Sequence, residues 1–457
     1  MTGVDPTIFR EYDIRGLVDE QLTEDAVEKI GRAYAAFTRE QGVRKITVGR
    51  DCREHSPRLA KRLIAGLNAG GVDVVDIGTC TSPILYFSLF HLKADGGIMI
   101  TGSHNPPEYN GLKISIGTRS VHGPDVQAFR KIIESNDYGD TGRAGTSSEQ
   151  DVAPDYIDWC VNNIQLGDRK LKVVADAGNG TAGPFVVPIL EKLGVEVVPL
   201  YCDMDSTFPN HHPDPTVEKN LEDLKKAVLE GKADVGIAFD GDADRLGAVD
   251  EQGTVLWGDQ MMILFSRAVL AEVPGATIVG EVKCSKTLYD DIEKHGGNGI
   301  MWRTGHSLIK DKMKETGAEL AGEMSGHIFF KHRFFGFDDG IYSGLRLLEI
   351  LSRTDQPISA LLADVPKTYT TPELRVDCPE SLKFRLVSAV TEHFKKSHDV
   401  IDIDGVRVLF DDGWGLIRSS NTQPILVLRF EADTEARLGE IRGYVEGELA
   451  KVRATLE

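Results

Sequence analysis

Apolar and polar positions along the chain form a unit that occurs three times: a short apolar strand, a polar loop, an amphipathic helix and a glycine-bounded strand. The copies cover residues 46–77, 171–200 and, with more divergence, 277–302. In the first copy, Ser56-Pro57 predicts a helix N-cap followed by a first-turn proline. Strands that alternate with helices in this way are typical of parallel or mixed α/β sheets.

Each copy is followed by one more apolar strand, and each of these strands ends in a distinctive polar loop. The strand-and-loop segments are 97–103, 235–240 and 319–325. In open α/β sheets, binding sites form beyond the carboxyl ends of the strands. The repeat therefore predicts three equivalent loops that face one another.

Changes in composition divide the chain into domains. Residues 135–151 are rich in Gly, Ser, Thr and Asp, which indicates a linker, and further breaks occur near Gly253 and at 368–372. Beyond the last break, strands such as 406–410 and 425–430 are closed by a helix with one apolar face. We therefore expect an α/β protein of three similar mixed α/β domains and a C-terminal α+β domain, with boundaries 1–148, 149–254, 255–367 and 368–457.

The composition is that of an ordinary globular protein, with 41% apolar and 27% charged residues among 457. The net charge of −19 would repel a polyanion, so we expect no nucleic-acid partner, and an anionic small substrate needs local Arg and Lys clusters. The sequence has no apolar run of about 18 residues and no signal peptide, which predicts a soluble, cytoplasmic protein with no membrane partner. The six cysteines lack C-x-x-C spacing, which argues against a zinc site and a disulfide framework.

The segment Thr101-Gly-Ser-His-Asn-Pro-Pro107 places Ser103 in a turn after a buried strand, because glycine and the proline pair cannot continue the strand. An ordinary N-cap serine is one interpretation of this turn. A serine hydrolase is not favoured, since Gly-x-Ser-x-Gly is absent and His104 is poorly placed as a base for its neighbour. A serine that carries phosphate instead needs a metal, cationic groups and a proton acceptor nearby.

The segment Asp240-Gly-Asp-Ala-Asp-Arg245 offers three carboxylates at alternate positions, a spacing suited to oxygen ligands around one small cation. Solvated turn acids are the alternative. The segment also mimics a calcium loop with Glu251 at the twelfth position, but Arg245 stands where such loops need glycine, and both flanks have the pattern of strands. We therefore predict that Asp240, Asp242 and Asp244 bind Mg²⁺ and that Arg245 balances part of their charge.

Three further segments carry possible chemistry. Gly178-Asn-Gly-Thr-Ala-Gly183 satisfies the dinucleotide fingerprint, but we interpret it as a structural tight turn because it lies in the second of three equivalent repeats. Residues 322–327 combine a carboxylate, a hydroxyl and an imidazole, which suits sugar hydroxyls. Residues 418–422 supply a guanidinium, hydroxyls, an amide and turn N–H groups, which suits a phosphate, with a polar surface turn as the alternative.

Together these motifs resemble the α-D-phosphohexomutase family, and within it the bacterial phosphomannomutase/phosphoglucomutases. The resemblance runs from Phe9-Arg-Glu-Tyr-Asp-Ile-Arg-Gly16 to the loop at Arg418, over nearly the whole chain. It implies four domains around a central cleft and reversible interconversion of hexose 1-phosphate and hexose 6-phosphate, with mannose or glucose as the sugar. The implied cofactors are Mg²⁺ and a hexose 1,6-bisphosphate, which is both intermediate and activator.

In the family pattern, Ser103 is the phosphorylated residue, and it ligates the metal together with Asp240, Asp242 and Asp244. The four domains would carry the phosphoserine, the metal, the sugar contacts and the anchor for the non-reacting phosphate, in that order. Lys113 and His306 are candidates for acid and base. The cleft residues that the resemblance implies are the catalytic Ser103, Lys113, Arg245 and His306 and the substrate-binding Tyr12, Arg15, Lys283, Glu323, Ser325, His327, Arg418, Ser420, Asn421 and Thr422.

Within the family, the identity of the substrate sugar leaves one alternative, a phosphoglucosamine mutase. Glu-Met-Ser-Gly-His at 323–327 resembles the mannose and glucose enzymes, whereas phosphoglucosamine mutases usually carry glutamine in place of Met324. Two alternatives of other classes are a sugar-phosphate-binding oxidoreductase that uses residues 178–183 and a sugar-phosphate sensor without turnover. The expected partner is a small sugar phosphate, and the expected assembly is a monomer or a weak homodimer.

Overall fold

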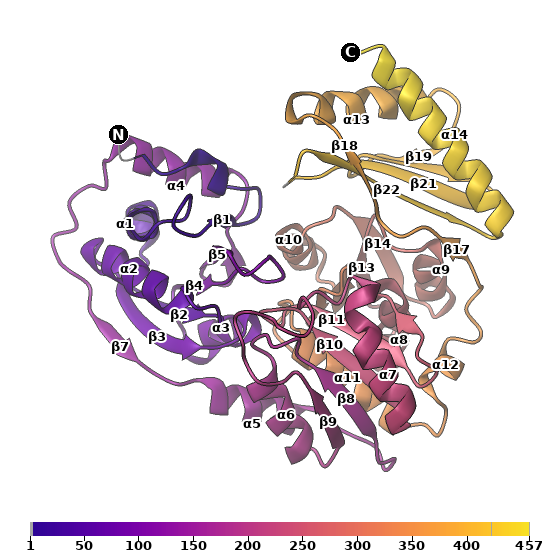
Figure 1. The fold of residues 1–457 in the computed structure, drawn as a ribbon, viewed down its shortest axis with the longest axis horizontal. Helices are drawn as coiled ribbons and strands as arrows, with labels where there is room; N and C mark the ends of the chain where they lie inside the picture. Colours follow the sequence, from indigo (N-terminus) through magenta and orange to yellow (C-terminus); the bar gives the residue numbers. More distant parts are fainter. Residues whose placement is uncertain (1–2, 422, 457) are drawn as a thin grey trace.

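The computed structural model describes residues 3–421 and 423–456. The described chain forms four sheets in succession, of seven, five, four and six strands. In Figure 1 the first domain, in indigo and violet, and the fourth domain, in yellow, lie on opposite sides, and the second and third lie below and between them. The predicted fold class, three similar mixed α/β domains and a C-terminal α+β domain, is confirmed.

The first domain contains η1 (Pro6–Ile8), β1 (Ile14–Leu17), α1 (Glu24–Thr38), η2 (Arg39–Gln41), β2 (Lys45–Arg50), α2 (Ser56–Ala69), β3 (Asp73–Thr79), α3 (Ser82–His91), β4 (Gly96–Ile100), β5 (Tyr109–Ile116), β6 (Arg119–Ser120), α4 (Pro124–Ser135) and β7 (Ser147–Glu149). Strand β2 is parallel to β3 and β4, and β5 is antiparallel to β4. Helix α2 begins at Ser56 with His55 at the N-cap, so the predicted N-cap at Ser56 is wrong by one residue. The Ser56 hydroxyl instead donates to Asp51 Oδ1 at 2.5 Å.

The second domain contains α5 (Ala153–Asn163), β8 (Lys172–Asp176), α6 (Gly183–Lys192), β9 (Glu196–Leu200), η3 (Glu218–Leu221), α7 (Glu222–Gly231), β10 (Val235–Phe239), β11 (Leu246–Asp250) and β12 (Val255–Leu256). Its sheet has the order β12-β11-β10-β8-β9. Strand β8 is parallel to β9 and β10, and β11 returns antiparallel to β10. The loop between β10 and β11 therefore lies at the carboxyl end of a central strand.

The third domain contains α8 (Gly258–Glu272), β13 (Thr277–Glu281), α9 (Lys286–Lys294), β14 (Asn298–Trp302), α10 (His306–Thr316), β15 (Leu320–Gly322), β16 (Ile328–Phe330), α11 (Gly340–Ser352) and α12 (Ile358–Leu361). Strand β13 is parallel to β14 and β15, and β16 is antiparallel to β15. The three repeats thus share one arrangement, in which a buried strand is followed by a loop and an antiparallel return strand.

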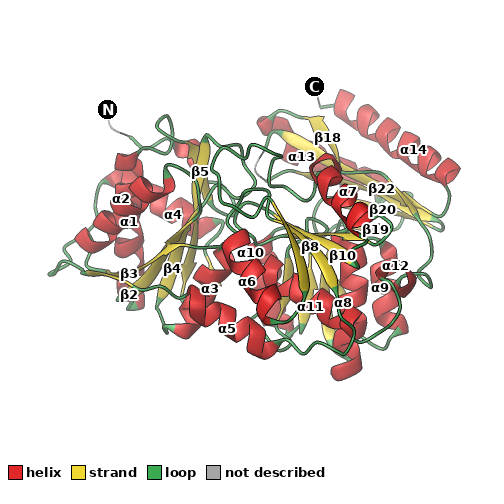
Figure 2. Cartoon of the chain, turned by 60° about the horizontal axis from the view of Figure 1, so that its bottom comes forward, coloured by secondary structure: helices red, strands yellow, loops and turns green. Residues whose placement is uncertain are grey.

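The fourth domain contains β17 (Tyr369–Thr370), β18 (Leu374–Asp377), α13 (Glu380–Phe394), β19 (Val400–Ile401), β20 (Val406–Phe410), β21 (Gly413–Ser419), β22 (Ile425–Ala432) and α14 (Glu435–Ala454). Its sheet is antiparallel, and α13 and α14 pack on one face, as Figure 2 shows. Side chains alternate along β21, so Ile417 packs under these helices, whereas Trp414 and Leu416 contact Val282 of the third domain. The same alternation turns Arg418 toward the third domain.

The apolar cores show how the domains are joined. One core is continuous from the first domain through the second and third, and it includes Leu85 of α3, Tyr156 of α5 and Phe265 of α8. The fourth domain has a separate core, and a small apolar cluster around Trp414 lies at its contact with the third. No helix among the described residues is long and apolar enough to cross a membrane.

Candidate active site

Residues from all four domains surround a cavity of about 1260 Å³. The loops that follow β4, β10 and β15 meet there, as the repeat in the sequence predicts. Asp240, Asp242 and Asp244 lie buried beneath the cavity wall, and Thr422 lies outside the described residues. The other residues implied by the resemblance all line the cavity: Tyr12, Arg15, Ser103, Lys113, Arg245, Lys283, His306, Glu323, Ser325, His327, Arg418, Ser420 and Asn421.

Ser103 occupies a left-handed turn after β4, with a φ angle of +46°. A side chain with a Cβ atom adopts this conformation only at a cost of about 1 kcal/mol, so the surroundings must hold it. No helix begins after Ser103, because the next element is β5, and the interpretation as an N-cap therefore does not apply. The buried Ser103 Oγ donates to Asp240 Oδ2 at 2.7 Å, a contact between the first and second domains.

Asp240, Asp242 and Asp244 form one buried cluster, in which one carboxylate oxygen from each residue lies within 4.8 Å of the other two. Their burial excludes the alternative of solvated turn acids. Lys113 Nζ of the first domain lies 2.6 Å from Asp242 Oδ2 and 2.5 Å from Asp244 Oδ2. The two domains therefore meet through one ammonium group and a cluster of three acids.

The charges of this cluster fit a bound divalent cation. Burial and the charges of Asp244 and Asp242 raise the pKa of Asp240 well above its usual value. Burial also raises the pKa of Asp244, but Lys113 and His327 outweigh it and hold that pKa well below its usual value. The buried Asp242 Oδ1 has no hydrogen-bond partner among the described residues. Three buried carboxylates that repel one another, one of them with an oxygen that lacks a hydrogen-bond partner, are a donor set that Mg²⁺ prefers.

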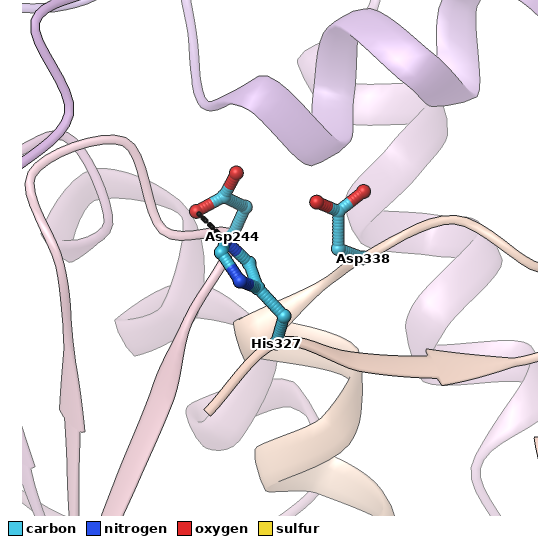
Figure 3. Close-up of side chains that lie close together, drawn as sticks. All are labelled: Asp244, His327 and Asp338. Atoms are coloured by element: carbon cyan, nitrogen blue, oxygen red, sulfur yellow. Dashed lines mark ion pairs between the residues drawn. The ribbon is translucent and has the colours of Figure 1, made fainter. Parts of the chain in front are cut away.

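His327 connects the acidic loop 240–245 of the second domain with the loop 322–327 of the third. Its Nδ1 lies 2.8 Å from Glu323 Oε2, and its Nε2 lies 3.3 Å from Asp244 Oδ1, the pair drawn with a dashed line in Figure 3. Burial lowers the pKa of His327, but Asp244 and Glu323 raise it, to about 9. Glu323 Oε1 accepts a hydrogen bond from Gly305 N at 2.5 Å, which also holds the start of α10 against this loop.

His306, the first residue of α10, has the opposite electrostatic environment. Burial and the charge of Lys310 lower its pKa well below 6.5. Its Nδ1 lies 3.5 Å from Asp338 Oδ2, and Lys310 Nζ lies 2.9 Å from the other oxygen of the same carboxylate. Figure 3 shows Asp338 across from His327 and Asp244. The two neighbouring histidines thus differ in charge at neutral pH.

The fourth domain reaches the cavity through the loop between β21 and β22. Asn421 donates a hydrogen bond to the Tyr12 hydroxyl, which itself donates to Thr304 O at 3.1 Å. Arg418 Nε pairs with Asp404 Oδ2 at 3.0 Å, and the same oxygen accepts from Thr304 N at 3.1 Å. The first, third and fourth domains therefore meet at one point of the cavity wall.

The segment with the dinucleotide fingerprint packs against the acidic loop. Thr181 N donates to Gly241 O at 2.9 Å, and a Cβ on Gly180 would lie 3.0 Å from Gly241 Cα. A Cβ on Gly183 would lie 1.9 Å from Cys202 O. These glycines permit close backbone approach within the protein, in agreement with the interpretation as a structural turn.

Sequence reasoning missed several polar residues of the site, among them Arg53, Asp338 and Glu373. Arg53 and its neighbour Asp51 follow β2, the strand beside β4, and Asp338 comes shortly after β16. For Asp51 and Arg53, the position directly after the strand beside β4 is a signal that could have found them. Their partners, however, are distant along the chain, so no local spacing indicated what they contact.

Models of protein families match each of the four domains. The matching descriptions are phosphoglucomutase/phosphomannomutase alpha/beta/alpha domain I at 6–138, domain II at 154–253, domain III at 257–369 and the C-terminal domain at 373–447. The chain belongs to the phosphoglucomutase/phosphomannomutase family. This protein is a phosphohexomutase, an intramolecular phosphotransferase, as the motifs in the sequence predict.

Relatives and solved structures agree with this assignment to the phosphohexomutases. A phosphoglucomutase of Neisseria meningitidis serogroup A is 46% identical over 97% of this chain and 96% of its own. A phosphomannomutase/phosphoglucomutase of Pseudomonas aeruginosa is 45% identical over 98% and 97%. A crystal structure of a phosphoglucomutase/phosphomannomutase family protein from Burkholderia thailandensis superposes with a TM-score of 0.93 at 43% identity, over 98% of each chain.

Proposed function

We propose that this phosphohexomutase interconverts hexose 1-phosphates and hexose 6-phosphates by carrying a phosphoryl group on Ser103. The observation that carries the proposal is the 2.7 Å contact between Ser103 Oγ and Asp240 Oδ2. It joins a strained, buried serine of the first domain to a cluster of three acids in the second. A serine beside a site suited to a divalent cation is the arrangement that phosphoryl transfer needs.

Asp240, Asp242 and Asp244 would hold Mg²⁺ together with an oxygen of phosphorylated Ser103. Bound there, the ion would neutralise charge that develops on the oxygens of the transferring phosphoryl group. Three carboxylates and a phosphoserine dianion exceed the charge of one divalent ion. Lys113 and Arg245 lie at the same cluster and offset part of that excess.

The reaction consists of two in-line transfers. In the first, the O1 or O6 hydroxyl of the sugar attacks phosphorus, a new P–O bond forms, and the bond from phosphorus to Ser103 Oγ breaks. The hexose 1,6-bisphosphate then turns over in the cavity and returns its other phosphate to Ser103, so the net change is an isomerisation. Any bisphosphate that escapes leaves an unphosphorylated enzyme, which added bisphosphate reactivates.

The proton of the attacking hydroxyl needs an acceptor in the cavity. His306 is our candidate, because its lowered pKa leaves the imidazole neutral at pH 7 and able to accept a proton. Lys113 is less suited to this task, since its two carboxylate partners, despite its burial, keep its pKa well above the usual value. We assign Lys113 the role of a fixed positive charge at the transferring group.

The substrate contacts divide between the third and fourth domains. Glu323, Ser325 and His327 would bind sugar hydroxyls, while Tyr12, Arg15 and Lys283 line the same cavity. The non-reacting phosphate would lie on Arg418, Ser420 and Asn421, with Thr422 predicted beside them. Because relatives at 45 and 46% identity are named for glucose alone or for mannose and glucose together, we propose glucose and mannose phosphates as substrates. A cytoplasmic monomer or weak homodimer remains our prediction for the assembly.

The proposal is tested by intact-mass analysis of freshly purified protein, with fragmentation to locate the adduct. We expect a phosphate adduct on the peptide that contains Ser103, and loss of turnover by orders of magnitude in Ser103→Ala with wild-type thermal stability. Ser135→Ala, at an exposed helix end, is the control and should retain activity. Normal turnover in Ser103→Ala, with glucose 1-phosphate and mannose 1-phosphate as substrates, would rule the mechanism out.

A further inference from the structure

The guanidinium of Arg53 lies inside the loop that carries Ser103. Arg53 NH2 donates to the carbonyl oxygens of Ser103 (2.8 Å) and Asn105 (2.5 Å). Its NH1 donates to those of Pro106 (2.6 Å) and Tyr109 (2.9 Å). One fully buried side chain therefore binds four carbonyl groups, three in the loop between β4 and β5 and one at the first residue of β5.

The backbone of this loop lies directly against the guanidinium plane. A Cβ on Gly102 would lie 2.5 Å from both Cζ and Nε of Arg53, so glycine is needed for this approach. Asp51 Oδ2 pairs with Arg53 Nε at 3.3 Å and also accepts from Gly102 N at 2.9 Å. The Asp51 carboxylate thus holds both the guanidinium and the peptide that precedes Ser103.

The second domain supports the same group from the other side. The Phe208 ring lies 5.3 Å from Arg53 Cζ, and His212 Nε2 lies within hydrogen-bond distance of His104 O. Both residues belong to the segment between β9 and η3. The Ser103 loop is consequently enclosed by contacts from the first and second domains, with Arg53 at their centre.

We propose that Arg53 is the positioning residue that holds Ser103 in its left-handed turn, with Oγ directed at the Asp240 cluster. Arg53 touches neither the substrate nor the transferring phosphoryl group in this role. It acts on catalysis because a guanidinium offers donors in a planar fork that can bind four carbonyls at once, which a lysine ammonium with three donors and another shape cannot do. The inference rests on the proposed function of Ser103 as the phosphoryl carrier.

The test is Arg53→Lys, which keeps the positive charge beside Asp51 but loses the fork. Because a displacement of about 1 Å at a reacting group can cost about 100-fold, we expect kcat to fall about 10- to 100-fold with KM nearly unchanged. Hydrogen exchange should accelerate at the Ser103 and Asn105 amides, which are bonded within this loop to Thr101 Oγ1 and Gly102 O.

The matched control is Arg50→Lys. Arg50 ends β2, three residues before Arg53, and its guanidinium pairs with Asp76 at 2.7 Å and 3.0 Å, away from the Ser103 loop. We expect this variant to lose thermal stability without a change in kcat or in the exchange of the loop amides. A purely structural role for Arg53 predicts that the two variants behave alike, and an equal, unchanged kcat in both would overturn the proposal.

A second variant decides the matter if Arg53→Lys does not fold. Phe208→Leu leaves every hydrogen bond of Arg53 in place and removes only the ring that covers the guanidinium, so a smaller loss of kcat, about 2- to 5-fold, is expected with faster loop exchange. Wild-type kcat and exchange in Phe208→Leu would then overturn the proposal. Failure of the proposed function gives a different result. If active wild-type enzyme shows no phosphate on Ser103, then Ser103 is not the phosphoryl carrier. The hydrogen-exchange comparison still reports whether Arg53 holds the Ser103 loop.

Discussion

Lys283 Nζ lies 3.1 Å from Glu373 Oε2, so a largely buried ion pair joins the third domain to the fourth at the wall of the cavity. The charge of Lys283 lowers the pKa of Glu373 to about 2. Burial lowers the pKa of Lys283, but Glu281 and Glu373 outweigh it and raise that pKa to about 12. The fourth domain has its own core, and this pair and the Arg429–Asp259 ion pair both link it to the third domain.

The first prediction concerns the pH dependence of that link. The folded pKa of Glu373 is below its ordinary value of 4.5, so its contribution to the free energy of unfolding is present above pH 4.5 and is lost as the pH falls toward 2. A shift of this size corresponds to about 3 kcal/mol. Glu373→Gln should lower the free energy of unfolding by about that amount at pH 7, and the difference from wild type should shrink below pH 4.5. Urea unfolding between pH 7 and pH 3.5 measures both effects.

A suitable control is Glu446→Gln, which removes an exposed pair with Arg442 on α14. Exposed pairs contribute about 0.2–1 kcal/mol, so we expect little change at either pH. If the difference in free energy of unfolding between Glu373→Gln and wild type stays constant down to pH 3.5, the ion pair contributes no pH-dependent stability.

The second prediction concerns the metal. Asp242→Asn keeps the shape of a proposed ligand but removes one of three negative charges, and it weakens the attraction to Lys113 as well. We expect the Mg²⁺ concentration for half-maximal activity to rise about 10-fold or more. Asp223→Asn, at an exposed position of α7 in the same domain, is the control and should leave the Mg²⁺ dependence unchanged. An unaltered Mg²⁺ titration in Asp242→Asn would show that this carboxylate is not a ligand.

The third prediction concerns His306 as the base. Lys310 lowers the pKa of His306 by its charge and also binds Asp338, the carboxylate nearest to the imidazole. In Lys310→Met both effects act in one direction, because a positive charge disappears and Asp338 is released to pair with the imidazolium. The pKa of His306 should therefore rise, and the acidic limb of the kcat/KM profile should move to higher pH.

Lys312→Met on the same helix is the control, since Lys312 pairs with Glu315 and lies over Trp302. An acidic limb that does not move in Lys310→Met excludes His306 as the titrating base.

The fourth prediction concerns Arg418, which would hold whichever phosphate is not reacting. A charged hydrogen bond to phosphate contributes roughly 1.5–3 kcal/mol, so Arg418→Ala should lose about 10- to 150-fold in kcat/KM in both directions. The overall equilibrium constant ties the two losses of kcat/KM together, so their equality is no test.

The discriminating measurement is the amount of free 1,6-bisphosphate trapped per turnover, which should increase in Arg418→Ala. Arg375→Ala, at an exposed position of the cavity rim, should not release more bisphosphate. A lower kcat/KM without additional release of 1,6-bisphosphate would mean that Arg418 acts only when the substrate enters the cavity.

Much of the fold was accessible from the sequence, since each strand-loop-helix repeat is built from neighbouring residues. The segment 277–302 folds as β13, α9 and β14 as predicted, and the apolar run at 235–239 is β10. Helix α13 was not predicted, and the N-cap of α2 was placed one residue late. In α2 the error has a physical cause, because Ser56 uses its hydroxyl on Asp51 and not on the free amides of the first turn.

By itself the sequence determined the chemistry that local spacing encodes: a serine in a strand-end turn, three alternate aspartates, a carboxylate with an imidazole, and a guanidinium loop. Only the tertiary structure decided which of these groups are in contact. It places Lys113 between Asp242 and Asp244 and Arg53 within the Ser103 loop. It also gives His306 and His327 opposite pKa shifts. The physical reason is that charge pairing and burial depend on distances between residues far apart in the chain, and the packing of domains sets those distances.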